Sequence, residues 1–215
     1  ALDFTIGAGH RFSDGNMVTA QDVEYSFERL LIQDRDGGPQ WMFYYPVMNV
    51  YAAKNGTEDP NFGLKIRDHI EYNATHVMIH LDNNFPEQTF LQIMTQAWAS
   101  VVEKNWAAGL GDFDGNLAAS WGTIYATWHN PGASFIEDLM MGTVTFKFDY
   151  CVHGAAYSVV RNVGYWDKWP ALVYPTGPQR LPSQVDRVTW NLLTSWPTRR
   201  ARFLAGDSDY TYVPR

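Results

Sequence analysis

A turn followed by a helix start, between Arg11 and Leu30, is the feature that most constrains how this 215-residue chain folds. Ser13-Asp14-Gly15-Asn16 predicts the turn, because Asp and Asn side chains bond their own backbone and glycine accepts a positive φ. Thr19 stands three residues before Asp22, which is the acidic form of a capping box. We therefore expect a helix over residues 20–32. Its buried stripe is Val23, Phe27, Leu30 and Leu31, and the polar residues Glu24, Glu28 and Arg29 fall largely off it.

Three stretches of the chain resemble a known family. RFSDGNMVTAQDVEYSFERL, at residues 11–30, is similar to the segment "kFsDGtpvTAeDVvySfeRl" of the extracellular solute-binding proteins of family 5, which serve peptide-type ABC importers. Residues 159–166 resemble that family's "i.l.rNp.Yw". Residues 185–209 resemble its closing motif, which runs from "vD.i.f" to "aGeiD". The order and approximate spacing match, so the resemblance spans nearly the whole chain.

The resemblance implies an α+β (or α/β) fold, the first lobe of a type II-like periplasmic-binding-protein fold of the dipeptide-binding type. In such a lobe a mixed sheet carries an inserted α+β subdomain. Residues 1–17 and 142–215 would form the core part of the lobe, and residues 18–141 the insertion. The second lobe would lie downstream of Arg215 and be absent, and the export signal and membrane tether would lie upstream. The chain is then expected to be a fragment of less than half of such a protein.

The same resemblance implies a solute-binding component of an ABC transporter. It would capture peptides or similar small solutes in the extracellular or periplasmic space and deliver them to permease subunits. Capture of this kind needs a cleft and a hinge, and neither catalysis nor a cofactor. Because much of the polar ligand contact in relatives comes from the other lobe, the fragment alone is expected to bind weakly or undetectably.

Candidate ligand-binding residues fall in two places. Trp41-Met42-Phe43-Tyr44-Tyr45-Pro46 is the densest aromatic cluster and lies where relatives carry an aromatic segment that can reach the ligand. Trp41, Phe43, Tyr44 and Tyr45 are therefore candidates, and the alternative is that they seal the helix against the rest of the lobe. Gly142 and Thr143 retain the GT of the family's "nPvGTGPy" loop. Val144-Thr145 replaces its GP, which puts ligand contacts there in doubt.

The composition limits which classes of partner and function are possible. The net charge of −7 argues against a nucleic-acid partner, which requires a basic face. The 9 tryptophans leave a carbohydrate-binding module open, which would show a row of exposed rings on one face. The exposure of Trp41, Trp121 and Trp128 would distinguish the two functions. The sequence has no run of 18 apolar residues, so no membrane-spanning segment is expected.

No catalytic or metal site is expected. The chain lacks G-x-S-x-G, H-E-x-x-H and P-loop motifs. His76 and His80 have a spacing that binds zinc on a helix, but on the strand expected here their Cα atoms would lie about 13 Å apart. Asp112-Phe113-Asp114-Gly115-Asn116 resembles part of a calcium loop without its bidentate Glu, and a loop tip is the better interpretation. Cys151, the only cysteine, is expected to pack as a small hydrophobe.

Pattern and turn residues predict the other elements. We expect strands over residues 2–6, 70–81, 146–148, 157–160, 187–193 and 209–213. We expect helices from Pro86, over 135–139, and from Ser195 to Gly206, and an irregular segment over 51–68.

Overall fold

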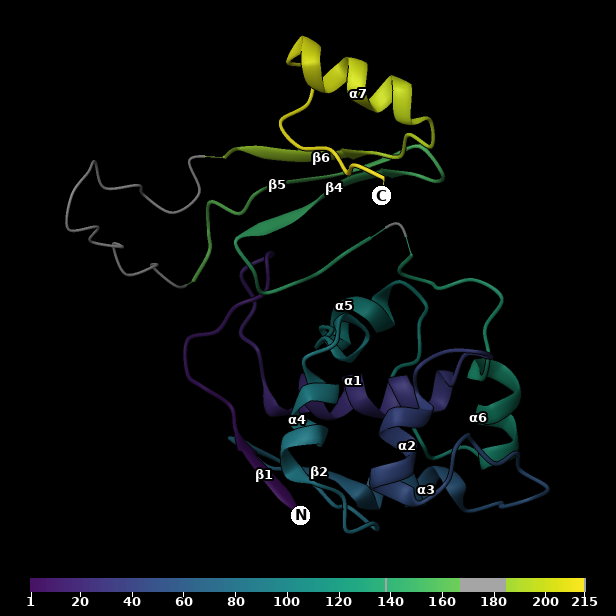
Figure 1. Ribbon diagram of the computed structural model, residues 1–215. Coiled ribbons are helices and arrows are strands. Elements are labelled where there is room, and N and C mark those ends of the chain that lie inside the picture. The colour runs from purple at the N-terminus through teal and green to yellow at the C-terminus, as the bar shows by residue number, and fades with distance from the viewer. Residues whose placement is uncertain (138, 167–184, 215) are drawn as a thin grey trace. The chain divides into compact units, whose positions relative to one another are not determined.

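The computed structural model describes residues 1–137, 139–166 and 185–214 (Figure 1). These residues form two compact units, residues 1–144 with 164–166 and residues 145–163 with 185–214. Both units mix helices and antiparallel strands, so the expected α+β class is confirmed. No helix in the described part of the chain is long and apolar enough to cross a membrane.

The first unit contains a three-stranded antiparallel sheet and a group of short helices packed around one longer helix. The sheet order is β1-β3-β2, with Phe4 opposite Val77 and Ile70 opposite Ile79. The elements are β1 (Leu2–Thr5), α1 (Ala20–Gln33), α2 (Trp41–Met48), α3 (Phe62–His69), β2 (Ile70–Tyr72), β3 (His76–Ile79), α4 (Glu87–Met94), the 3₁₀ turn Ala97–Ala99, α5 (Lys104–Gly109) and α6 (Trp121–Trp128).

Helix α1 starts where its capping residues predict. The Thr19 backbone N–H donates to the Asp22 carboxylate at 2.9 Å, and the Asp22 N–H donates to the Thr19 hydroxyl at 3.2 Å, which completes the capping box. Before the helix, Gly15 adopts a φ of 101°, and its N–H donates to the Phe12 carbonyl at 3.0 Å. The predicted turn and helix start are both confirmed.

Replacing Thr19 with alanine should lower the free energy of unfolding by about 1 kcal/mol, because the Asp22 N–H loses its side-chain acceptor. Thr19→Ser keeps the hydroxyl and is the matched control, with stability close to the parent chain. Urea denaturation followed by circular dichroism measures both. Equal losses in the two variants would mean that the threonine methyl group, rather than the cap, stabilises the helix start.

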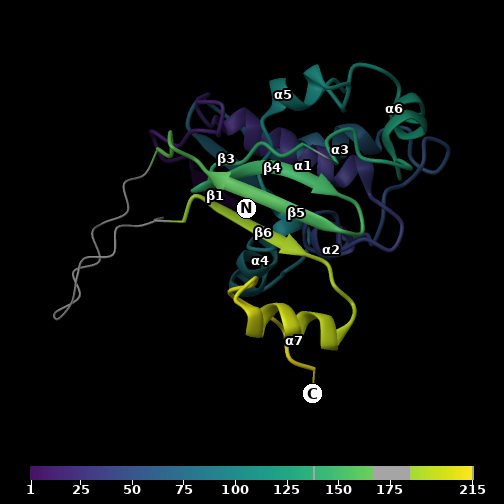
Figure 2. The ribbon, with the colours of Figure 1, turned by 90° about the horizontal axis from the view of Figure 1, so that it is seen from above.

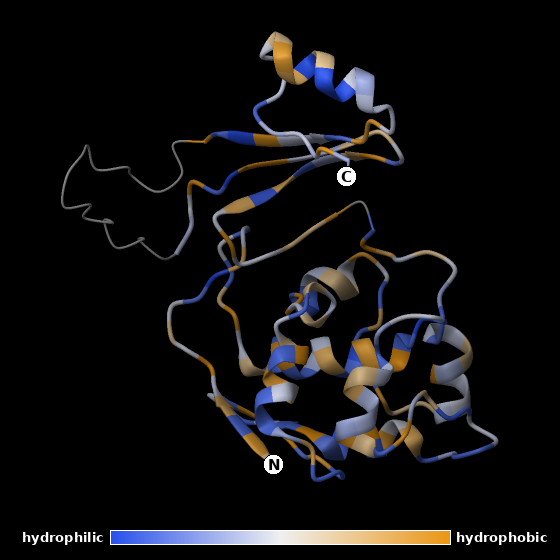
Figure 3. Cartoon of the chain, viewed as in Figure 1, coloured by the Kyte–Doolittle hydropathy of each residue, from blue (hydrophilic) through white to orange (hydrophobic). Residues whose placement is uncertain are grey.

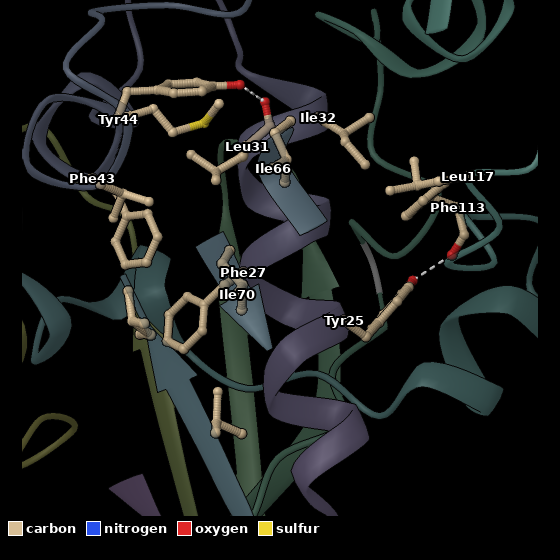
Figure 4. Close-up of a cluster of buried hydrophobic side chains, with 14 of the residues drawn as sticks. Tyr25, Phe27, Leu31, Ile32, Phe43, Tyr44, Ile66, Ile70, Phe113 and Leu117 are labelled. Atoms are coloured by element: carbon tan, nitrogen blue, oxygen red, sulfur yellow. Dashed lines mark hydrogen bonds between the residues drawn. The ribbon is translucent and has the colours of Figure 1, made fainter. Parts of the chain in front are cut away.

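The core of the first unit surrounds α1 (Figure 4). Two tyrosines cross it with their hydroxyls satisfied by backbone carbonyls: Tyr25 donates to Phe113 at 2.6 Å, and Tyr44 donates to Leu31. The fully buried aliphatic side chains around them come from α1, α3 and the sheet: Leu31, Ile32, Ile66, Ile70 and Ile79. Burial raises the pKa of both tyrosines above the ordinary value.

The second unit is an antiparallel sheet, with β5 between β4 and β6 (Figure 2). The elements are β4 (Phe146–Val152), β5 (Ala156–Arg161), β6 (Arg187–Asn191) and α7 (Trp196–Ala205). Ser195 caps α7, Pro197 lies in its first turn, and Gly206 ends it at a φ of 81°, which confirms the predicted helix. The hairpin turn at Gly154 is also confirmed.

The second unit differs from the first in burial. Hydrophobic and hydrophilic residues alternate along α7 (Figure 3), yet none of its side chains is buried. Within the described residues 145–163 and 185–214, the buried residues are Ser158 and Asn162, and no hydrophobic side chain reaches the same burial. The hydrophobic core shown by the described residues therefore belongs to the first unit.

Four predicted elements differ from the structure. The strand expected over residues 70–81 is two antiparallel strands, β2 and β3, because the chain reverses at residues 73–75, where the Asn73 side chain accepts from the Thr75 and His76 N–H groups. Helix α3 lies within the segment expected to be irregular. A polar stretch with Gly and Pro precedes it, but Phe62 and Ile66 lie one helical turn apart and are both buried, which stabilises the helix. Residues 135–137 form a turn instead of a helix, and residues 209–213 have no strand partner. The prolines at positions 170, 175, 178 and 182 predict an irregular crossing over residues 166–182, and residues 167–182 of it lie outside the described part of the chain.

The predicted subdomain division, with 1–17 and 142–215 as core and 18–141 as insertion, stays a prediction. Within the first unit, however, β1 pairs with β3, so residues 2–5 share a sheet with part of the expected insertion. Ser13 of the early turn also contacts residues 141–142: its N–H donates to the Gly142 carbonyl at 2.8 Å, and its hydroxyl lies 3.2 Å from the Met141 sulfur.

Candidate functional site

The aromatic segment predicted to reach a ligand forms α2, and its rings divide between core and surface. Phe43 and Tyr44 have no exposed area, and Phe43 stacks on Phe27 at 5.0 Å between ring centroids. Trp41 is 48% exposed, and the partly exposed Tyr45 stacks on Tyr51 at 5.0 Å. Phe43 and Tyr44 therefore take the core role that the sequence left as the alternative, while Trp41 and Tyr45 retain surface that a ligand could contact.

The other predicted ligand residues, Gly142 and Thr143, are partly buried and act through their backbone. The Gly142 carbonyl accepts from Ser13, and the Thr143 carbonyl accepts from the Trp166 indole N–H at 2.9 Å. Two successive residues of this loop therefore accept hydrogen bonds from Ser13 and Trp166, which belong to two of the segments that resemble family motifs. These hydrogen bonds hold the backbone of the loop through its carbonyl groups.

The tryptophans of the described residues do not form the exposed row that a carbohydrate-binding module requires. Trp121 is 3% exposed, and its indole N–H donates to the Lys54 carbonyl at 2.6 Å. Trp128 is partly buried between Phe113 and Phe135. Of the tryptophans in the described residues, Trp41 and Trp190 are the exposed ones, and they belong to different units. The exposure of these tryptophan rings therefore argues against a carbohydrate-binding module.

A pocket of about 540 Å³ lies in the first unit among α1, the end of α3, β2 and the start of α5. We call it the Glu24 pocket, and the residues that define it are Gln21, Glu24, Arg67, Glu71, Lys104 and Gly115. Its floor holds charged groups that the sequence placed on the polar side of α1. These carboxyl groups lie off the apolar stripe and are nevertheless buried: Glu24, which lines the pocket, is 6% exposed, and Glu28, one helical turn further on, is 1% exposed.

The two carboxyl groups share the floor with one guanidinium group. Arg67 donates through Nε to Glu28 Oε1 at 3.3 Å and through Nη2 to the Gly115 carbonyl at 3.1 Å. The second oxygen of Glu28 is buried without a donor among the described residues. Burial, followed by the nearby Glu28 charge, raises the pKa of Glu24 from 4.5 to about 8. Glu24 is therefore protonated at neutral pH and can supply the proton that Glu28 Oε2 lacks.

A second pocket of about 700 Å³ lies among the end of α2, the segment that joins it to α3, α3 itself and Asp82. Two ion pairs lie among its residues: Lys65 lies 2.5 Å from Asp59, and His69 Nε2 lies 3.0 Å from Asp82. Glu71, which lines the Glu24 pocket, pairs with His80 at 3.2 Å. Among the described residues no group of three His, Cys, Asp or Glu side chains is arranged to hold a metal ion.

Comparison with known proteins gives a consistent result. The model of the bacterial extracellular solute-binding proteins, family 5 (middle), matches residues 1–215. The dipeptide-binding protein DppE of Bacillus subtilis (strain 168) is 23% identical over 213 residues, which are 98% of this chain and 32% of that protein. The chain thus spans about a third of the length of the relative it matches.

Solved structures show the same fold. The oligopeptide-binding protein AppA of Bacillus subtilis, in complex with a nonapeptide, superposes with a TM-score of 0.59 at 18% identity, over 95% of this chain and 31% of that chain. OppA of Haemophilus influenzae, in complex with the peptide RPPGFSPFR, gives 0.58 at 16% identity, over 95% and 33%. The expected fold of a solute-binding-protein fragment is confirmed.

Proposed function

Because the chain belongs to the bacterial extracellular solute-binding proteins of family 5, we propose that it is part of a longer protein that captures peptides for an ABC importer. The observation that carries the proposal is the family match over all 215 residues. Relatives named for binding dipeptides and oligopeptides support peptides as the solute class. The protein would act in the extracellular or periplasmic space, tethered to the membrane, and pass its ligand to permease subunits without catalysis.

Within this fragment, Trp41 and Tyr45 are the predicted ligand residues that offer exposed ring surface. Tyrosine and tryptophan suit the contact because they combine apolar area with a polar tip. Phe43 and Tyr44 would hold α2 in place from the core side, and Gly142 and Thr143 would supply a fixed loop. The rest of the cleft, and the hinge that closes it, would belong to the part of the protein that its relatives have in addition.

Isothermal titration calorimetry with a mixed peptide library and an oligosaccharide panel tests the proposal. A version extended to the full length of the relatives should bind peptides, and the 215-residue chain alone should bind them at least about tenfold more weakly, since it supplies part of the buried contact area. Trp41→Ala in the long version should weaken peptide binding. Oligosaccharide binding retained by the short chain would instead favour a self-contained aromatic module.

A further inference from the structure

The charges in the Glu24 pocket do not cancel. Glu28 and Arg67 form one ion pair, and Glu24 is neutral at neutral pH. Lys104, the first residue of α5, then remains as a cation, and among the described residues no carboxylate is close enough to form an ion pair with it. A partly buried ammonium group without a counter-charge favours an anionic ligand group.

Gly115 makes room for the cationic groups at the floor of the pocket. A Cβ at this position would lie 2.9 Å from both Lys104 Nζ and Lys104 Cε, so any larger residue would displace the ammonium group. The carbonyl of Gly115 accepts from Arg67 Nη2. Lys104 and Arg67 thus converge on one residue, and their side chains can face a single carboxylate between them.

The rim of the pocket carries the opposite charge. Asp68, next to Arg67, and Glu71 on β2 are exposed and line the pocket opening. A ligand with only negative charge would be repelled by this rim, and a ligand with only positive charge would be repelled by Lys104. The layered charges, positive at the floor and negative at the rim, match a small molecule that carries a carboxylate at one end and an ammonium group at the other.

We propose that the Glu24 pocket binds a small zwitterion of the amino-acid type, with its carboxylate on Lys104 and Arg67 and its ammonium group toward Asp68 and Glu71. This site is separate from the aromatic surface of α2 and does not rest on the proposed peptide-binding function. The volume of about 540 Å³ is within the range of small-molecule sites.

The proposal makes binding depend on pH. When Glu24 ionises it becomes a counter-charge for Lys104 and repels a ligand carboxylate, so affinity falls as pH rises through about 8. The charged and titratable groups that face Glu24 are Glu28 on α1, Arg67 and Asp68 on α3, Glu71 and Tyr72 on β2, and Lys104 on α5.

The test titrates the 215-residue chain with L-alanine, acetate and ethylamine, and follows the lysine side chains in ¹³C–¹H spectra. L-Alanine should shift the Lys104 resonance saturably at pH 6.5, acetate should bind at least about threefold more weakly, and ethylamine should leave the resonance unmoved, because floor and rim each contribute one ion contact. At pH 9 the affinity for L-alanine should fall by about tenfold, since one unit charge is added beside the ligand.

Three variants identify the groups involved. Lys104→Met should weaken L-alanine binding at least about tenfold, judged from shifts of the alanine methyl resonance, because the anchoring charge is lost. Glu24→Gln should keep the affinity measured at pH 6.5 and remove its fall at pH 9. Lys54→Met, in the second pocket, is the control and should change neither. No saturable shift at Lys104, equal binding of acetate and alanine, or an unchanged pH dependence in Glu24→Gln would each overturn the proposal.

Discussion

Replacing Phe43 with alanine is expected to lower the free energy of unfolding by about 3–5 kcal/mol, the usual cost of removing a fully buried phenylalanine. The ring has no exposed area and lies between Phe27 and Phe90, at 5.0 and 5.4 Å between ring centroids. These contacts join α2 to α1 and α4, and a cavity at the junction cannot be filled by solvent without further loss. Denaturation in urea, with circular dichroism and tryptophan fluorescence as probes, measures the change.

Trp41→Ala is the matched control, because it removes an aromatic ring from the same helix at a position that is 48% exposed. Its effect on stability should be about 0.5 kcal/mol or less. In a version of the protein extended to the length of its relatives, the two variants should separate the roles: Trp41→Ala weakens peptide binding at unchanged stability. A Phe43→Ala variant of normal stability that loses peptide binding would restore Phe43 as a ligand contact.

The sequence could not distinguish Phe43 from Trp41, and the reason is physical. Helix α2 reads WMFYYPVM, which is apolar on every side, so no contrast between polar and apolar positions shows which side faces the core. Helix α1 presents the opposite case. Its capping box fixes its start, and Phe27 and Leu31 of the predicted stripe are buried. Val23 and Leu30 of that stripe are half-buried, and Tyr25, which lies off it, is fully buried.

Helix α3 shows the other limit of pattern reading. Its eight residues are too few for a strong periodic signal, and packing rather than intrinsic propensity stabilises a helix of this length. Gly63 also lies within it, against the Trp121 ring, where a Cβ would be 2.7 Å from the nearest ring atom. Glycine lowers helix propensity, so its presence argued against a helix here. The reason for glycine at this position is the close approach of Trp121, which lies far along the chain and cannot be inferred from the local sequence.

The Glu24 pocket was not predicted for a related reason. Glu24 and Glu28 are one helical turn apart, which is visible in the sequence, but their partners Arg67 and Lys104 come from segments far along the chain. Without those partners, charged residues on a helix are expected to face solvent. The family resemblance was more informative for fold than for this pocket, because its motifs locate turns and helix starts rather than the charges between them.

Replacing Glu24 with glutamine is expected to change how stability depends on pH. Between about 4.5 and about 8 the folded chain holds a proton on Glu24 that the unfolded chain releases. Unfolding then releases a proton, so the free energy of unfolding falls as pH rises, by at most about 1.4 kcal/mol per pH unit. The contribution is fully present below pH 4.5 and is lost as pH passes through about 8.

Glutamine cannot ionise, and its amide can still donate to Glu28 Oε2. Glu24→Gln should therefore match the parent chain at pH 5 and exceed it at pH 9 by about 2–5 kcal/mol, measured by urea denaturation at each pH. Burial also raises the pKa of Asp34 and Glu103, which gives both proteins a further fall of the same sign. Burial raises the pKa of Glu28 as well, and because Glu24 and Glu28 interact, the difference between the two curves reports this pair of carboxyl groups.

Asp68→Asn is the control for this comparison, because it removes an exposed carboxylate at the rim of the same pocket. Its stability curve should run parallel to that of the parent chain between pH 5 and pH 9, the range just given for Glu24→Gln. If Glu24→Gln ran parallel as well, Glu24 would be ionised in the folded chain at neutral pH. Lys104 would then already have its counter-charge, and the zwitterion proposal would fail together with the stability prediction.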